Sequence, residues 1–94
     1  MKNMQGERER NRCLMILALL GGTVWSVDLT KNCIREICRS LIPNKYVFKD
    51  TLDTLNNSDV YGLTQKGWDE LFLLCKPGRS IIYKMIREEY VNQK

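Results

Sequence analysis

The sequence predicts a mainly α-helical fold with a minor β component (α+β), built as one domain. Apolar residues recur at helical spacing in several segments, glycine or proline separates those segments, and one short β-prone run turns directly into a helix. Ninety-four residues are enough for one domain with a small core. We therefore expect helices over most of the chain and few strand residues.

The β-prone run leads into a helix at Thr64. Residues 60–63 favour an extended backbone because they combine valine, tyrosine and leucine. Thr64 can then cap a helix by accepting a hydrogen bond from a backbone N–H. Four apolar residues follow at helical spacing: Trp68, Leu71, Phe72 and Cys75. Gly67 lies in the first turn, where the lack of a side chain lets a neighbouring element approach closely. We expect a strand-to-helix corner here.

The first helix is expected over residues 7–20, after a flexible tail at residues 1–6 that shows no periodicity. Its apolar stripe comprises Cys13, Ile16, Leu17 and Leu20. Apolar residues also flank this stripe, so the helix must be covered on most sides and should be central in the domain. Gly21-Gly22 ends it. Residues 23–27 predict a short strand or an extended connector, with Trp25 packed against the first helix.

Two further helices are expected on either side of Pro43. The second begins near Asp28, which is the predicted N-cap. Its inward side is expected to comprise Leu29, Cys33, Ile34, Ile37, Cys38 and Leu41. Its outward row comprises Lys31, Arg35 and Arg39, which lie four apart. The third helix is expected over residues 44–55, with Val47, Phe48, Leu52 and Leu55 inward and Lys45, Tyr46, Lys49, Asp50 and Asp53 outward. A helix-turn-helix requires this order of helix, break and helix.

The Tyr-x-Leu-Thr-x-x-Gly pattern at residues 61–67 resembles the end of the wing in winged helix-turn-helix domains, especially small prokaryotic, phage and plasmid ones. The resemblance covers roughly residues 8–75 and is similar in layout to replication-relaxation proteins of plasmids, with transcription regulators close behind. It implies a winged-helix-like domain over residues 7–75 in which helix 44–55 reads the major groove.

The expected wing is vestigial. Only a short polar segment at residues 56–59 separates the third helix from the β-prone run. This polar segment is expected to form a tight turn. Residues 60–63 are then expected to be the sole returning strand, paired with residues 23–27. A domain without a full wing loses the usual wing contact with DNA.

The C-terminal segment, residues 76–94, contains one more helix. Lys76-Pro77-Gly78 ends the preceding helix, and Ser80 caps a final helix that runs to about Asn92. One face of it carries Ile82, Met85, Ile86 and Tyr90. In small winged-helix proteins such a helix often pairs two subunits, so we predict a homodimer seam at these residues. Packing of the helix onto its own domain is the equal alternative.

The charge balance suits an anionic partner and equally a soluble surface that is slightly basic. The formal net charge is +4 without any histidine, and the pI is near 9. We expect double-stranded DNA to bind through two sets of residues: Lys45, Tyr46 and Lys49 at bases, and Lys31, Arg35 and Arg39 at phosphates. Together with the resemblance, this predicts a transcription regulator or replication accessory factor of a phage, plasmid or other mobile element.

Two aspartates favour an alternative function. Asp50 and Asp53 lie on the outward side of the expected reader helix, where they would repel phosphate. The same carboxylates suit the basic surface of a protein. The alternative is a protein-binding winged-helix module that uses helix 44–55, such as a phage-encoded inhibitor of a host nuclease or defence system.

No residue pattern indicates catalysis, a cofactor or a metal. The chain lacks histidine, a glycine-rich phosphate loop and a nucleophile motif, so we expect no enzyme. The cysteines at positions 13, 33, 38 and 75 lack Cys-x-x-Cys spacing and are expected to be small buried side chains in a reducing cytoplasm. The apolar run at residues 13–20 is too short to span a bilayer, so we expect a cytoplasmic protein without membrane contact.

Overall fold

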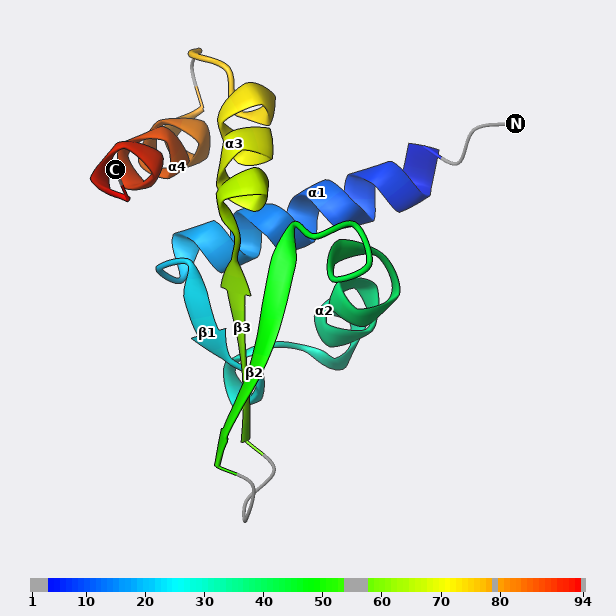
Figure 1. The fold of residues 1–94 in the computed structure, drawn as a ribbon. Coiled ribbons are helices and arrows are strands. Elements are labelled where there is room, and N and C mark those ends of the chain that lie inside the picture. The colour runs from blue at the N-terminus through cyan, green and yellow to red at the C-terminus, as the bar shows by residue number, and fades with distance from the viewer. Residues whose placement is uncertain (1–3, 54–57, 79, 94) are drawn as a thin grey trace.

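Helices cover one face of a small antiparallel sheet in the computed structural model, which describes residues 4–53, 58–78 and 80–93 (Figure 1). The elements follow in the order α1 (Met4–Leu19), β1 (Thr23–Trp25), the 3-10 turn η1 (Ser26–Asp28), α2 (Lys31–Glu36), the π-helical segment η2 (Ile37–Leu41), β2 (Val47–Asp53), β3 (Ser58–Leu63), α3 (Gln65–Leu74) and α4 (Ile81–Asn92). The predicted fold class, mainly α with a minor β component, is confirmed.

Helix α1 is central, as predicted, because it packs against α2, α3, α4 and the sheet. Its buried side chains are Cys13, Leu14, Leu17 and Ala18. Two residues of the predicted stripe, Cys13 and Leu17, belong to this buried face, whereas Leu20 is 50 % exposed. The helix begins at Met4, inside the segment expected to be a tail. Gly21 and Gly22 end it with φ angles of 102° and 91°, which glycine adopts readily.

The sheet has the strand order β1-β3-β2, with both pairs antiparallel. The expected pairing of residues 60–63 with residues 23–27 is confirmed, since Val24 lies opposite Tyr61. One sheet face joins the core through Val24, Val47, Tyr61 and Leu63. Trp25 and Phe48 lie on the opposite face and are 44 % and 42 % exposed. Trp25 therefore lies outside the core, contrary to the prediction.

The prediction of a helix over residues 44–55 is wrong, because this region forms strand β2. Val47 is buried while Phe48 is exposed, the alternation of a strand with one covered face. β2 pairs with β3 from Val47 opposite Leu63 to Asp53 opposite Ser58. Such pairing with the following strand outweighs the helical spacing of a few apolar residues.

The expectation of a vestigial wing is wrong for the same reason. β2 and β3 form a hairpin that extends away from α3 and α4 (Figure 1). Ser58 and Asp59, expected in a tight turn, are strand residues of β3. Residues 54–57 lie outside the described part of the chain, and so does the expected inward position of Leu55.

The corner between β3 and α3 has the predicted structure. The Thr64 side chain accepts a hydrogen bond from the Gly67 backbone N–H at 3.1 Å, which makes Thr64 the N-cap of α3. Trp68, Leu71 and Cys75 are buried beneath the helix. The predicted N-cap of α4 is also confirmed, because the Ser80 side chain accepts from the backbone N–H of Tyr83 at 3.3 Å.

Candidate nucleic-acid interface

A row of exposed cationic side chains lies on α2 and η2. Thr30, rather than the predicted Asp28, caps α2, because its side-chain oxygen accepts from the backbone N–H of Cys33 at 3.1 Å. At the other end, the backbone N–H of Ile42 donates to the Ile37 carbonyl at 2.9 Å, which widens the last turn into a π-helix. The side chains of Lys31, Arg35 and Arg39 are exposed, as predicted for the outward row.

Glu36 holds Arg39 at one end of this row. A terminal nitrogen of Arg39 donates to a carboxylate oxygen of Glu36 at 2.6 Å, and the Glu36 side chain is 6 % exposed whereas that of Arg39 is 64 % exposed. This hydrogen bond and the Glu36 charge raise the pKa of Arg39, whose ordinary pKa is already far above neutral. Arg39 is therefore a permanent cation fixed by an almost buried carboxylate.

A groove of about 470 Å³ separates α1 from α2 and η2. Arg12 of α1 lines it together with Arg35 and Arg39, and the acidic side chains in its lining are Glu9 and Glu36. Arg12 is not among the DNA-contacting residues that the sequence predicts. Its side chain is exposed, and its closeness to α2 depends on tertiary packing.

The structure separates the three residues expected to approach bases. Lys45 lies in the loop before β2 with φ 67°, and its carbonyl accepts a 2.6 Å hydrogen bond from the Thr64 hydroxyl. Tyr46 is half-buried in the same loop. Lys49 lies on β2, with its Nζ 3.7 Å from a carboxylate oxygen of Asp59. None of the three lies on a helix, so the predicted reader does not exist in that form.

Tyr46 instead holds two cations that the sequence analysis did not single out. The guanidinium carbon of Arg10 lies 5.6 Å from the centre of the Tyr46 ring, and Lys66 Nζ lies 4.8 Å from it. Lys66 Nζ also donates to the backbone carbonyl of Asn44 at 2.8 Å. These contacts fasten α1 and α3 to the loop before β2, which is a structural role.

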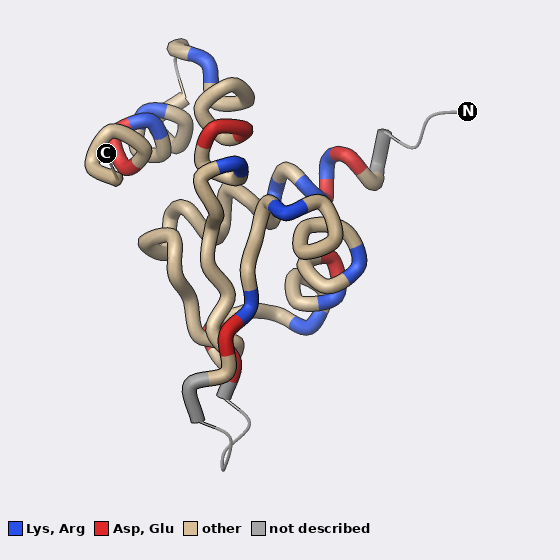
Figure 2. The backbone as a smooth tube through the Cα atoms, viewed as in Figure 1, with Lys and Arg blue, Asp and Glu red and all other residues tan. Residues whose placement is uncertain are grey.

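The hairpin is the acidic part of the fold. Asp50 is exposed on β2, and Asp59 on β3 accepts from the hydroxyl of Thr51 at 2.7 Å. Figure 2 shows blue segments along α2 and the adjacent part of α1, whereas red segments mark the far part of the hairpin. Red segments also mark α1, α2, α3 and α4, so the helices carry charges of both signs.

The structure divides the predicted dimerisation residues between two environments. Ile86 is fully buried, and the ring of Tyr90 stacks on Phe72 with 4.4 Å between ring centres. Ile82 and Met85 are 49 % and 48 % exposed. Half of the expected seam therefore packs α4 onto its own domain, which is the alternative that the sequence left open.

Three of the cysteines are buried, and Cys38 is exposed, contrary to prediction. The contact with Cys33, together with burial, raises the pKa of the Cys13 thiol, and burial raises the pKa of the Cys75 thiol. Burial also raises the pKa of Tyr61 to about 12, with further contributions from the neighbouring Cys38 and Asp59. The raised pKa values keep these buried groups protonated and neutral near neutral pH.

Within residues 4–53, 58–78 and 80–93, no three potential metal ligands gather at one place. In the same ranges, none of the helices combines the length and apolar character needed to cross a bilayer. Comparison of the chain with known protein families, curated proteins and solved structures gives no match.

Proposed function

We propose that the protein binds double-stranded DNA through the exposed side of α2 and η2. The observation that carries this proposal is the meeting of three arginines from two helices at one groove: Arg12, Arg35 and Arg39. Lys31 extends the row along α2. Closely spaced arginines release counterions from the phosphate backbone when they bind it, and this release drives association with DNA.

The position of α2 in the chain supports the same surface. α2 and η2 precede the β2–β3 hairpin, as the recognition helix does in the winged helix-turn-helix layout that the sequence resembles, but only the short turn η1 stands where that layout has its first helix. Asn32 and Arg35 lie in its exposed part, and these residue types can hydrogen-bond adenine and guanine edges. In this proposal α2 replaces residues 44–55 as the reader, and the acidic hairpin stays away from phosphate.

The resemblance to small phage and plasmid proteins extends the proposal to a biological role. A DNA-binding protein of this size would act as a transcription regulator or a replication accessory factor of a mobile element. The target sequence would be recognised by the few side chains at the exposed surface of α2, with phosphate contacts supplying most of the affinity.

The test is fluorescence anisotropy with a labelled random duplex, titrated at several salt concentrations. We expect the logarithm of the binding constant to fall linearly with the logarithm of salt concentration, with a slope of about 0.9 per phosphate contact. The double variant Lys31→Ala and Arg35→Ala should weaken binding and reduce the slope by roughly 1 for each lost contact.

A matched control removes the same charge from a distant surface. Lys76 and Lys84 are exposed at the α3–α4 end of the fold, and α4 lies on the opposite side from α2 (Figure 1). Their double alanine variant should retain the wild-type salt slope. Binding that does not respond to salt, or equal losses in both double variants, would exclude α2 as the DNA surface.

The acidic hairpin favours protein binding as a second candidate function. Phe48 and Asp50 lie on the outer side of β2, and Trp25 lies on the same sheet face, across β3 on β1; Phe48 and Trp25 are partly exposed. A basic protein surface with an apolar patch would complement this face, as in an inhibitor of a host nuclease or defence system. A stoichiometric host partner should then be lost with Asp50→Lys and retained with Arg35→Ala, and the opposite pattern would reject this candidate.

A further inference from the structure

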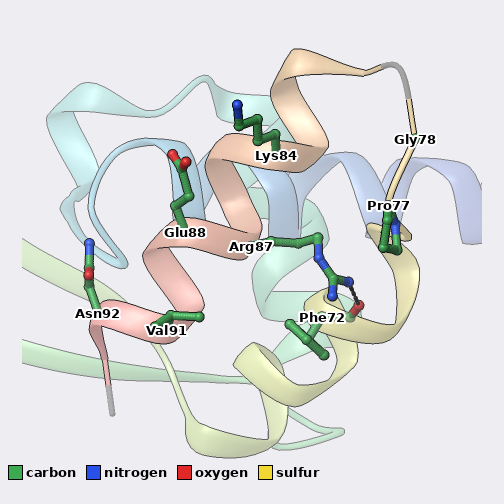
Figure 3. Close-up of a pocket in the computed structure, with 8 residues that line it drawn as sticks. All are labelled: Phe72, Pro77, Gly78, Lys84, Arg87, Glu88, Val91 and Asn92. Carbon is green, nitrogen blue, oxygen red and sulfur yellow. Dashed lines mark hydrogen bonds between the residues drawn. The ribbon is translucent and has the colours of Figure 1, made fainter.

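A second groove, of about 620 Å³, lies between the C-terminal end of α3 and helix α4 (Figure 3). Its apolar lining comes from Phe72, Pro77 and Val91, and Arg87 and Lys84 contribute cations. Small-molecule sites commonly have volumes of roughly 300–1,000 Å³ and combine an apolar lining with a few polar groups. The groove has the size and composition of a ligand site, and it lies away from the α2 surface.

Arg87 is the polar group that reaches furthest across this groove. One terminal nitrogen donates to the backbone carbonyls of Phe72 at 3.3 Å and Cys75 at 3.1 Å. The guanidinium carbon lies 4.0 Å from the centre of the Phe72 ring, so the cation covers the ring face. These contacts fix the direction of the guanidinium, and Figure 3 shows the hydrogen bond from Arg87 to Phe72.

The charge of Arg87 has no anionic counterpart in the described part of the chain. Both of its hydrogen-bond acceptors are neutral carbonyl oxygens, and within residues 4–53, 58–78 and 80–93 no carboxylate forms an ion pair with it. Its Nε–H and second terminal nitrogen remain able to donate. A half-buried cation held in this way attracts an anion that can accept two parallel hydrogen bonds.

The rim of the groove carries one charge of each sign. Lys84 and Glu88 are exposed and extend from α4 away from Phe72 (Figure 3). Together with Arg87 they leave a net charge of one positive unit around the groove. A single negative charge on the ligand would therefore be balanced, whereas a cationic ligand would meet two cations.

We propose that this groove binds a small amphipathic monocarboxylate. The carboxylate accepts hydrogen bonds from Nε and the free terminal nitrogen of Arg87, and the apolar body lies against the edge of the Phe72 ring, Pro77 and Val91, because Arg87 and Tyr90 already cover the ring faces. A carboxylate matches the planar fork of a guanidinium, and burial of the hydrocarbon body supplies the remaining affinity. This site is independent of the proposed DNA surface.

The experiment compares octanoate, octan-1-ol and octylamine, which share one chain length and differ in the head group. Each is titrated into ¹⁵N-labelled protein at concentrations below micelle formation, and amide shifts are followed by NMR. Octanoate should give saturable shifts at Phe72 and Val91, with an affinity at least about tenfold above that of the alcohol, because a charge-assisted pair contributes about 1.5–3 kcal/mol. Equal or tighter binding of the alcohol or the amine would overturn the proposal.

Two tryptophan substitutions on the same helix locate the site. Val91→Trp fills the groove and should abolish the octanoate shifts. Ile81→Trp is the matched control, because Ile81 is 72 % exposed and does not line the groove. Octanoate binding that survives Val91→Trp, or that is lost equally with Ile81→Trp, would overturn the assignment.

Two further variants separate charge from packing and from DNA binding. Lys84→Met removes a rim cation from an exposed side chain, so it should weaken octanoate binding a few-fold while leaving the melting temperature unchanged. The Lys31→Ala and Arg35→Ala double variant should bind octanoate as the wild type does, whether or not it binds DNA. Loss of octanoate binding in that double variant would contradict a separate site.

Discussion

The Cα of Gly67 lies against the backbone carbonyl oxygen of Tyr46, so closely that a Cβ at position 67 would overlap that oxygen. The backbone N–H of Thr64 donates to the same oxygen at 3.0 Å. The start of α3 is thereby fixed directly on the loop that precedes β2. A glycine is required here by the close approach of two backbone segments.

Replacing Gly67 with alanine should destabilise the protein by about 1–3 kcal/mol, because the added methyl group must push the loop away. The loss should occur even though alanine is the better helix former by about 1 kcal/mol. Urea unfolding followed by circular dichroism measures it. Gly78→Ala is the control, because its nearest neighbour lies 3.9 Å from the added Cβ. An equal or larger loss at position 78 would contradict this explanation.

Thr64→Ala should cost about 0.5–2 kcal/mol, because it removes the N-cap of α3. The same substitution removes the 2.6 Å hydrogen bond that the hydroxyl donates to the Lys45 carbonyl. Thr64→Ser keeps the hydroxyl and should retain most of the stability. Denaturation midpoints of the two variants provide the comparison, and equal losses would show that the methyl group matters more than the hydrogen bonds.

Ile86→Ala should be the most damaging alanine substitution on α4, at about 2–5 kcal/mol, because Ile86 is fully buried. Ile82→Ala should cost much less, since Ile82 is 49 % exposed. Thermal unfolding at two protein concentrations measures both values. If Ile86 served only a dimer seam, the loss would vanish at low concentration, whereas packing within one domain predicts no concentration dependence.

Stability should fall as the pH rises from about 10 to about 12, with part of the fall due to Tyr61. Its pKa in the folded protein is about 12, above the ordinary value of 10.0, so the unfolded chain loses the phenolic proton first and ionisation favours unfolding. Tyr61→Phe should show a shallower decline in this window. The urea midpoint measured across the range tests the difference in slope, because loss of the hydroxyl also changes the absolute stability. Parallel declines would contradict the raised pKa.

The sequence was sufficient where local chemistry determines the structure. Thr64 and Gly67 identified the corner at α3, Gly21-Gly22 marked the end of α1, and Ser80 marked the start of α4. In each case the residue that starts or ends the helix lies at the helix end itself, so the local sequence is enough to identify it. The same reasoning placed the cationic row on the exposed side of α2.

The sequence was insufficient where contacts between separate elements decide the structure. Val47 and Phe48 fit a helical apolar pattern, but Val47 lies opposite Leu63 and Phe48 covers Gly62 in the sheet. No local signal shows that this pairing is available. The groove beside α2 escaped prediction for a related reason, because Arg12 approaches Arg35 and Arg39 only after α1 packs on α2.

The π-helical turn at Ile37–Leu41 has a consequence for the spacing of the cationic row. A π turn accommodates one more residue than an α turn, so it rotates the side chains within it relative to those of the preceding helix. The direction in which Arg39 points is therefore set by backbone winding as well as by its distance in sequence from Arg35. Removing a single residue from this turn would restore regular winding and change the geometry of the row without removing any charge from it.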